Sequence, residues 1–370
     1  MKGLSILFIS FHNFAHWIPG IPQENEFNFT SSNLSEFLDA RFFEFPIDYF
    51  FSFFGHYGVQ LFIFFSAYSY FKKREEILHG NHLIFLRNRF IKIGIPFLMI
   101  AVLTGVIRVL LDLWDEPDTS FAEHCSTLFA PLLWGVAKIF CLTPFMDGRE
   151  YAGQGPWWFI SMIMMFYLIL PLLLRIKPSV KNLLIVNLVS FAMLYLSDTY
   201  LGWFNIRFTV MGHLPEIFFG FFIANLGLKQ SKRFDNAKYA YLSIIPLFAL
   251  LTFLNSSLLL WYLTAIPATI AFYYLFKLIL KISGKRISNI FYLLGSLSLY
   301  IFLINGLIRE VFIRFTPRGP GQLWHLVLLI ASFTVTVFIS ALCFRVDKPI
   351  QARLKTILTP AAPATPARRL

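Results

Sequence analysis

Residues 156–174 read PWWFISMIMMFYLILPLLL, an apolar run without a single charged side chain. An α-helix of this length can cross the roughly 30 Å hydrocarbon core of a bilayer. Comparable apolar runs recur from end to end, near residues 2–19, 46–70, 93–112, 182–198, 207–228, 239–255, 258–280, 290–309 and 322–344. We therefore predict an all-α fold, a polytopic transmembrane helical bundle of about ten spans.

The composition supports the same fold class. Of 370 residues, 57% are hydrophobic and only 14% are charged, whereas a water-soluble domain has roughly a quarter of its residues charged. The runs are too continuous for the alternating strands of about ten residues that build an outer-membrane barrel. The net charge of +12 comes from basic residues placed between the apolar runs rather than in one patch, which argues against nucleic acid as a partner.

The connectors between the runs separate by charge. One set is basic, including residues 72–92, 175–181, 229–238 and 281–286, and the alternate set is acidic, including residues 24–44 and 115–150. By the positive-inside rule the basic set faces the cytoplasm, so we expect both termini there. The apolar stretch 125–145 does not fit this count, and we interpret it as re-entrant or interfacial. We expect residues 1–345 to form the transmembrane domain and residues 346–370 a disordered cytoplasmic tail, because its Pro-Ala-rich end lacks apolar content.

Two histidines in the first run are the strongest candidates for chemistry. His12 and His16 are four residues apart, so they share one helical face near the outer leaflet. A neutral imidazole there can accept a proton from a hydroxyl. The alternative is that His12 is a hydrogen-bonded packing residue and that His16 lies at the interface beside Trp17.

A basic pair stands at the predicted cytoplasmic start of the third run. Arg89 and Lys92 are three residues apart, with Arg87 nearby. Such groups can hold phosphates, arginine through its two-pronged guanidinium and lysine as a point charge. The alternative is ordinary anchoring at lipid headgroups, so membrane lipid is a partner in either interpretation.

On the predicted outer side, aromatic and acidic residues are candidates for contacting sugars. Trp157 and Trp158 open the run at 156–174, and their indole rings can stack on sugar rings or simply form an interfacial belt. Glu24, Glu26 and Glu150 can hydrogen-bond hydroxyl groups. His213 and Glu216 lie inside a run, where they need internal partners.

Several motifs then resemble one family in their order and spacing. They are Lys2 to His12, the Gly58-Val59-x-Leu61-Phe62 stretch that runs into Ser66-Ala67-Tyr68, Arg89-x-x-Lys92 before Pro96, Trp158-Phe159-Ile160-Ser161 running to Pro171, Gly220, and Gly295-Ser296-x-Ser298-x-Tyr300. Together they look like the acyltransferase 3 family of integral membrane enzymes. Ala67 and Lys92 stand where the family has glycine and a second arginine, and Asn305 stands where it commonly has a histidine.

The resemblance implies an O-acyltransferase of the cell inner membrane. The acyl group, most often acetyl, comes from cytoplasmic acyl-CoA and goes to a hydroxyl of an extracytoplasmic carbohydrate such as O-antigen, capsule or exopolysaccharide. His12 takes the place of the essential first-span histidine, with His16 as a second candidate. Arg89, Lys92 and Arg87 would hold the acetyl-CoA phosphates. Ser66 or Tyr68 would orient the imidazole or donate to the tetrahedral oxyanion.

Some alternatives remain open in the sequence. The rival function is a transporter or flippase for a lipid-linked sugar, which also needs polar residues inside spans. No metal is expected, since the three cysteines do not have metal-ligand spacing. A homo-oligomer is left open.

Overall fold

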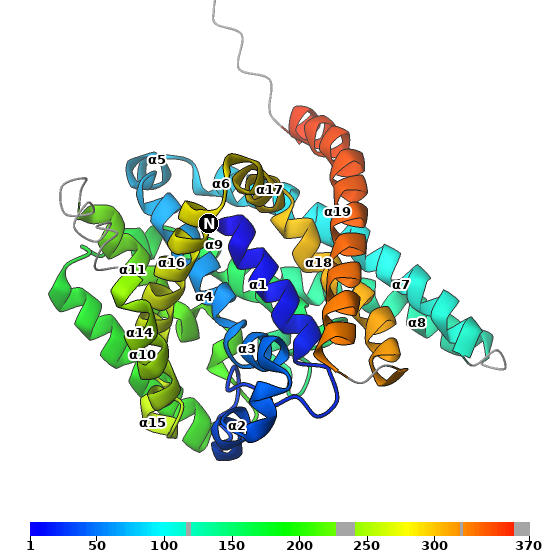
Figure 1. Ribbon diagram of the computed structural model, residues 1–370. Helices are drawn as coiled ribbons and strands as arrows, with labels where there is room; N and C mark the ends of the chain where they lie inside the picture. Colours follow the sequence, from blue (N-terminus) through cyan, green and yellow to red (C-terminus); the bar gives the residue numbers. More distant parts are fainter. Residues whose placement is uncertain (116–119, 227–240, 319–320, 359–370) are drawn as a thin grey trace, which may run out of the picture.

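The structure is a computed structural model that describes residues 1–115, 120–226, 241–318 and 321–358. Within these ranges it contains helices and connecting loops but no β-strand, which confirms the predicted all-α class. The helices form a bundle around α1 (Lys2–Ala15), whose N-terminus lies at one end of the molecule (Figure 1). The basic residues predicted at 229–238 lie outside the described residues.

The first half of the chain builds the centre of the bundle and a projecting hairpin of two helices. Its helices after α1 are α2 (Ser31–Phe37), α3 (Pro46–Phe54), α4 (Tyr57–Phe71), α5 (Arg74–His79), α6 (His82–Arg89), α7 (Ile95–Asp115), α8 (Phe121–Ile139) and α9 (Trp158–Arg175). A π-helical turn, η2 (Phe90–Gly94), joins α6 to α7. The antiparallel pair α7 and α8 projects from the body (Figure 1).

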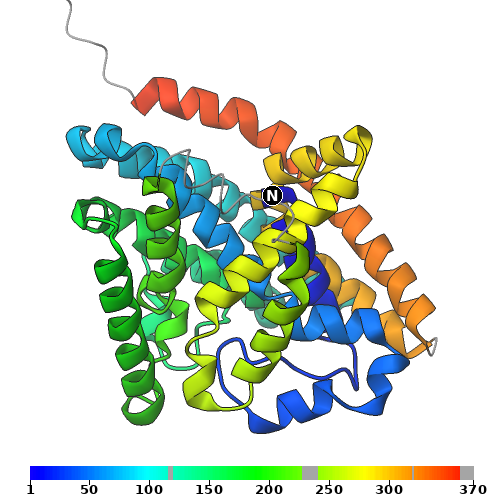
Figure 2. The same cartoon turned by 60° about the vertical axis from the view of Figure 1, so that its left-hand side comes forward.

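The second half surrounds α1 and α4 on their remaining sides. Its helices are α10 (Val180–Tyr200), α11 (Leu214–Asn225), α14 (Ile244–Leu254), α15 (Leu258–Trp261), α16 (Ala265–Ile282), α17 (Lys285–Ser296), α18 (Ser298–Phe312) and α19 (Gln322–Leu358). Helix α11 packs along α4, α14 packs on α16, and α18 packs on α19. Figure 2 shows α19 crossing one side of the bundle.

Helix α1 is the central element, since ten of its 14 residues are buried. It contacts α3, α4, α17 and α18. Glycines allow these close contacts, since a Cβ at Gly55 would lie 2.7 Å from the His12 Cβ and one at Gly3 would lie 1.8 Å from the Phe291 carbonyl oxygen. Small residues of this kind let helix backbones approach within a membrane bundle. The position of His12 is therefore fixed by the helices that surround it.

The lipid-facing character of the bundle is visible on α7. Val102, Val106, Leu110 and Leu113 are spaced along one helical face, and each is more than 40% exposed. A contiguous apolar stripe of this kind on a water-soluble protein would be an aggregation site. A hydrocarbon environment gives it a favourable solvent, in agreement with a membrane-embedded bundle.

The count of about ten spans is not confirmed. The described part of each predicted run is mostly helical, but only five helices of the described chain are long and apolar enough to cross a membrane, or up to seven if two bent pairs each count as one span. The pair α3 and α4 bends by 46°, and the pair α17 and α18 by 80°. Helix α1 ends at Ala15, and α11 and α14 are likewise short for a 30 Å core. Length and apolarity alone do not orient the termini.

The structure differs from the prediction in two segments. Residues 125–145, interpreted as re-entrant or interfacial, lie mainly in α8, a continuous helix packed along α7 that is not among the candidate spans. The expected disorder after residue 345 is wrong for residues 346–358, because α19 runs on to Leu358. Asp347, 1% exposed, accepts hydrogen bonds from Tyr300 and Gln351 and ties this extension to the bundle. Residues 359–370 lie outside the described residues.

The tight contact between α4 and α11 gives a test of the packing. A Cβ at Gly220 would lie 2.7 Å from the Phe64 carbonyl oxygen and 3.0 Å from the Ala67 Cβ. We expect Gly220→Val to force these helices apart at a cost of about 1–3 kcal/mol. The measurement is the temperature at which the detergent-solubilised protein loses its monodisperse gel-filtration peak.

Gly202→Val is the matched control, because nothing lies within 4 Å of a Cβ at that position. The control variant should melt like the wild type. Equal melting temperatures for the two variants would contradict this account of the α4–α11 contact.

Candidate active site

His12 is held by two backbone carbonyls at the bend between α3 and α4. The imidazole is buried, and its Nδ1 lies 3.1 Å from the carbonyl oxygens of both Phe51 and Ser52. Carbonyl oxygens only accept hydrogen bonds, so Nδ1 must carry the proton in this network. In the neutral ring, Nε2 is then the nitrogen with a free lone pair.

Two carboxyl groups face this Nε2 atom. The loop after α1 folds back over its end, so that Glu24 Oε1 lies 3.7 Å and Glu26 Oε2 lies 3.9 Å from His12 Nε2. His16 makes a 2.7 Å hydrogen bond through Nδ1 to Glu24 Oε2. The ring of His56, at the bend before α4, lies 5.7 Å from the His12 ring. The structure thus brings together four predicted site residues and adds His56, which the sequence analysis did not select.

The two carboxyl groups differ in their protonation. Burial alone would raise the pKa of Glu24, but His12 and the hydrogen bond from His16 hold it below its usual range. Burial and the neighbouring Glu24 carboxylate raise the pKa of Glu26 well above its usual range. Two close carboxyl groups cannot easily both ionise. The two carboxyl groups therefore differ in acidity, and Glu24 is the stronger acid of the pair.

The same residues include a geometry that could hold a metal ion. His12, His16 and Glu24 each offer a ligand atom, and these atoms lie within 4.8 Å of one another. Histidine and carboxylate ligands suit a cation such as Zn²⁺. The hydrogen bond between His16 and Glu24 already satisfies two of these atoms. The direct hydrogen-bonding role therefore explains the geometry without a metal.

A cavity of about 460 Å³ opens below this cluster, on the side of the basic connectors. Four cationic side chains line it: Lys2, Lys73, Arg89 and Lys92. Its walls become apolar further in, with Ile9, Val59 and Phe159 among the lining residues. The cavity therefore has a basic part and an apolar part, and Ile9 is one helical turn before His12. We call it the inner cavity.

Arg89 is held at this cavity by aromatic rings. Its guanidinium lies 5.1 Å from the ring centre of Tyr70, 4.9 Å from that of Phe85 and 5.6 Å from that of Tyr167. Contacts of this kind orient a guanidinium while leaving its N–H groups able to bind an anion. Lys92 lies on the π-helical turn η2, a helix form that is frequent at functional sites. Arg87 is on α6 and does not line the inner cavity.

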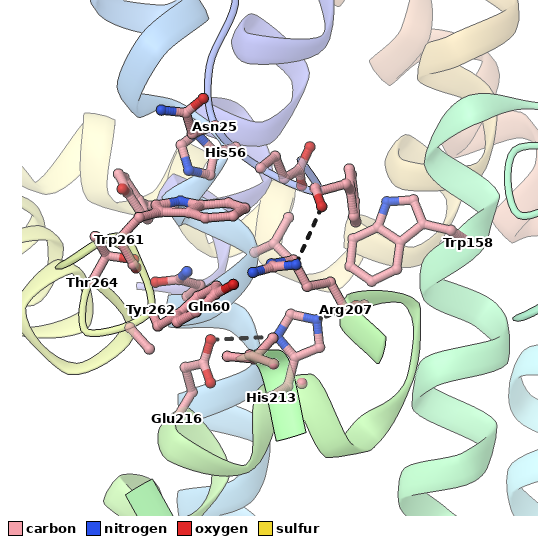
Figure 3. A pocket seen from close by; sticks show the side chains of 17 residues that line it. Asn25, His56, Gln60, Trp158, Arg207, His213, Glu216, Trp261, Tyr262 and Thr264 are labelled. Atoms are coloured by element: carbon pink, nitrogen blue, oxygen red, sulfur yellow. Dashed lines mark hydrogen bonds and ion pairs between the residues drawn. The ribbon is translucent and has the colours of Figure 1, made fainter. Parts of the chain in front are cut away.

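A second cavity, which we call the outer cavity, lies on the other side of the cluster. It is lined by Asn25, Glu26, Phe27, His56, Tyr57, Val59, Gln60, Trp158, Leu194, Arg207, Gly212, His213, Glu216, Trp261, Tyr262, Thr264 and Ala265. Figure 3 shows Arg207 at its centre, with Trp261 on one side and Trp158 on the other. Val59 lines both cavities. Glu26 is in the wall of the outer cavity and contacts His12.

Not every predicted sugar-contacting residue reaches the outer cavity. Trp158 lines it, stacked on His213 with 5.7 Å between ring centres. Trp157 was wrong as a substrate contact, because it is 0% exposed and donates its indole hydrogen to the Leu303 carbonyl oxygen at 3.0 Å. Glu150 lines neither cavity, and its backbone oxygen accepts a hydrogen bond from Lys138.

The structure does not bring Ser66 or Tyr68 to His12. His12 lies beside Gly55, just before α4 begins at Tyr57. By the helical rise, Ser66 lies about 14 Å from Tyr57 along α4. The Ser66 hydroxyl donates to the Phe62 carbonyl oxygen and lines the inner cavity. The Tyr68 ring lies under Lys72. Neither residue contacts the imidazole in this structure, so the orienting role is not seen here, and donation to the oxyanion stays a prediction.

Several residues of the outer cavity were not found from the sequence. Arg207 lies in a short 3-10 helix, Trp261 ends α15 and Tyr262 follows it, and their proximity depends on how α10, α11 and α15 pack. Arg207 forms a two-pronged ion pair with Asp198, at 2.8 and 3.0 Å, and stacks 4.1 Å from the Trp261 ring centre. The need of His213 and Glu216 for internal partners is confirmed, since His213 contacts Glu216 and the Arg207 carbonyl oxygen.

The unequal protonation of the two glutamates gives a pH-dependent prediction. The raised pKa of Glu26 means that stability from its protonated form is lost as the pH rises above the usual glutamate pKa. The lowered pKa of Glu24 means that stability from its ionised form is present at neutral pH and lost only in acid. We expect Glu26→Gln to melt at or above the wild-type temperature at alkaline pH, and Glu24→Gln to melt below it.

The measurement is the melting temperature in detergent from about pH 5 to about pH 9. The melting temperature of Glu26→Gln relative to that of the wild type should increase as the pH rises. Glu36→Gln, on the exposed surface of α2, is the control and should follow the wild type throughout. A Glu26→Gln protein less stable than the wild type at alkaline pH would contradict the assignment.

Comparison with known proteins supports one family. A family model described as an acyltransferase domain, that of the acyltransferase 3 family, matches residues 1–345, nearly the whole chain. No curated protein and no solved structure matches the chain. The matched range contains the histidine cluster, both cavities and every helix up to the middle of α19. The chain is therefore a member of the acyltransferase 3 family of membrane acyltransferases.

Proposed function

We propose that this protein transfers an acyl group, most often acetyl, from cytoplasmic acyl-CoA to a hydroxyl of an extracytoplasmic carbohydrate. The observation that carries the proposal is that His12 lies beside both cavities: it contacts Glu26 in the wall of the outer cavity and is one helical turn beyond Ile9 in the wall of the inner cavity. One cavity has a basic lining and the other has aromatic, amide and carboxyl groups. A donor and an acceptor can therefore approach the same imidazole from opposite sides.

The inner cavity fits the donor. Coenzyme A carries several phosphates, and Lys2, Lys73, Arg89 and Lys92 provide four cationic groups where such a polyanion would bind. The apolar walls near Ile9 and Phe159 suit an acyl-pantetheine arm, which is less polar than the nucleotide. Ser66, whose hydroxyl lies in this wall, is assigned here to the donor site. The volume of about 460 Å³ is within the range of cofactor sites.

His12 is assigned as the general base. Its Nε2 accepts the proton of the acceptor hydroxyl as the hydroxyl oxygen attacks the thioester carbonyl. The tetrahedral intermediate collapses with cleavage of the carbon–sulfur bond, and the proton passes to the departing thiolate to give the free thiol of CoA. The carboxylate of Glu24, 3.7 Å from Nε2, stabilises the imidazolium that forms. The alternative, transient acylation of Nε2, uses the same lone pair.

The outer cavity fits the acceptor side. The positive-inside rule puts the basic connectors, and with them the inner cavity, at the cytoplasmic face. The histidine cluster and the outer cavity then face the periplasmic side of the bacterial inner membrane. Trp158 is the aromatic surface predicted for a sugar, and Glu26 lies between the outer cavity and His12.

A transporter or flippase remains the rival function. It would need a continuous polar path through the bundle, yet Arg108 is paired with Glu310 at 2.7 Å and Arg309 stacks 4.5 Å from the ring centre of Trp17. The glycan of a deletion strain distinguishes the two functions. Loss of an acetyl group from otherwise normal glycan supports transfer, and normal acetylation with reduced export supports transport.

The first prediction concerns His12. His12→Asn keeps an N–H group that can donate to the Phe51 and Ser52 carbonyls but removes the Nε2 lone pair. We expect acyl transfer to fall at least about 100-fold, in line with loss of a general base. The measurement is acetylation of cell-surface glycan, by NMR and mass spectrometry, in a deletion strain complemented with the variant.

His79→Asn is the matched control, because the His79 side chain is 82% exposed and lines neither cavity. It should restore acetylation fully. A membrane-inserted His12→Asn protein that acetylates like the wild type would remove His12 from the mechanism.

The second prediction concerns the donor. Arg89→Gln and Lys92→Gln should each raise the Kd for coenzyme A at least about tenfold, since a hydrogen bond to a charged group contributes about 1.5–3 kcal/mol. The measurement is calorimetric titration of the purified protein with coenzyme A. Both effects should shrink at high salt.

Arg286→Gln and Lys285→Gln provide the controls, because these residues are exposed on α17 and line neither cavity. They should bind coenzyme A like the wild type. Equal weakening by all four substitutions would indicate nonspecific attraction to a basic surface instead of a donor site.

A further inference from the structure

The outer cavity contains buried polar atoms that have no hydrogen-bond partner within the protein. They include Glu216 Oε2, Gln60 Oε1 and Asn25 Nδ2. Glu216 and Asn25 are each 1% exposed. Leaving such atoms unpaired costs free energy, so their gathering at one cavity calls for an explanation. A bound molecule with several hydroxyl groups could satisfy both the two acceptors and the donor.

The charges at the cavity select among such molecules. Glu26 and Glu216 bring two carboxyl groups to its wall. The one arginine among its lining residues, Arg207, already pairs with both oxygens of Asp198 and also lies 3.4 Å from the Phe27 carbonyl oxygen. Its charge is therefore balanced within the protein. An anionic sugar would bring a further negative charge to a wall whose cation is already paired, so the cavity favours a neutral ligand.

The size of the outer cavity and its aromatic lining further restrict the class of ligand. The cavity volume is about 60 Å³ and the cavity is partly open, so it can take one hydroxyl-bearing edge of a sugar, with the rest of the ring outside. Trp158, Trp261 and Tyr262 in the wall can pack on the apolar face of that ring.

We propose that the outer cavity is the acceptor-recognition site and that it selects a neutral sugar residue over a uronic acid. This inference rests on the proposed acyl transfer and adds the acceptor's chemical class. Glu216 and Gln60 accept hydrogen bonds from sugar hydroxyls, and Asn25 donates one. Glu26, beside both the cavity and His12 Nε2, connects this recognition site to the reacting atoms.

The test compares two sugars that differ at one carbon. Methyl α-glucoside and methyl α-glucuronoside are titrated into the purified protein, and binding is followed by tryptophan fluorescence because Trp158 and Trp261 lie in the wall. We expect saturable millimolar binding of the glucoside and at least about tenfold weaker binding of the glucuronoside, a difference of about 1.4 kcal/mol. Equal or tighter glucuronoside binding, or no saturable glucoside binding, would overturn the proposal.

Two substitutions locate the site. Gln60→Met should weaken glucoside binding by loss of an acceptor oxygen. Glu216→Gln should weaken glucoside binding and also reduce the discrimination against the glucuronoside, because it removes a negative charge. Glu36→Gln, at an exposed position on α2, should change the binding of neither sugar. Unchanged sugar binding in both cavity variants would overturn the proposal.

Coenzyme A titration of the same samples distinguishes this inference from the proposed function. A variant that binds coenzyme A normally is folded, so its altered sugar binding reports on the outer cavity. If the wild type selects between the sugars but neither binds coenzyme A nor transfers an acyl group, the proposed function is contradicted and the acceptor site is not. If it transfers the acyl group normally but does not select between the sugars, the proposed acceptor site is contradicted and the function is not.

Discussion

The hydrogen bonding of His12 Nδ1 to the Phe51 and Ser52 carbonyls is the interaction on which the site depends. The last carbonyls of a helix have no partner within that helix, and α3 ends at Phe54, where the chain bends by 46° into α4. The Phe51 carbonyl oxygen also accepts the Gly55 N–H at 2.9 Å, so the imidazole is a second donor to it and bonds the Ser52 carbonyl oxygen as well. These contacts set the orientation of the ring and its tautomer. The bend in the second span therefore helps to decide which His12 nitrogen keeps its lone pair.

The same bend separates the two cavities. Just after the bend, His56, Val59 and Gln60 line the outer cavity. Further along α4, Phe62, Ser66 and Ser69 line the inner cavity. Because Val59 belongs to both, the boundary between the cavities is about one side chain thick. The inner cavity has four cationic lining residues, whereas the outer one has Glu26, Glu216 and one arginine, Arg207, which is paired with Asp198. This division suits the polyanionic donor and the hydroxyl-bearing acceptor of the proposed reaction.

The sequence predicts those features that depend on local pattern. Apolar runs place the helices, the four-residue spacing puts His12 and His16 on one face, and the charge of the connectors marks Arg89 and Lys92. It does not predict features that depend on packing between distant segments. Trp157 and Trp158 are adjacent and chemically identical, yet one donates to Leu303 in the core and the other lines the outer cavity. The difference follows from their positions, since Trp157 ends a 3-10 turn and Trp158 begins α9, so the two side chains leave the backbone in different directions.

The errors in the fold have an equally physical origin. Apolar runs alone cannot tell a straight span from a pair of helices joined at a bend, and only tertiary contacts decide between them. At residues 346–358 the composition is polar enough for disorder, but Asp347 finds Tyr300 and the helix continues. Ser66 matches a family motif, yet its hydroxyl is used by its own helix. A motif therefore fixes residue type, while the partner of that residue is decided by the fold.

Burial of the histidine cluster has a final consequence for the chemistry. The His12 side chain is 5% exposed and that of Glu24 is 6% exposed, so bulk water has little access to Nε2. A reactive thioester brought to this imidazole would otherwise be hydrolysed by the same base that activates an alcohol. The side chain of Glu26 lines the outer cavity 3.9 Å from Nε2, and burial beside Glu24 raises its pKa, which favours the uncharged acid over a second carboxylate next to Glu24. This side chain covers the base on the side of the outer cavity, and in the proposed reaction an incoming hydroxyl displaces it.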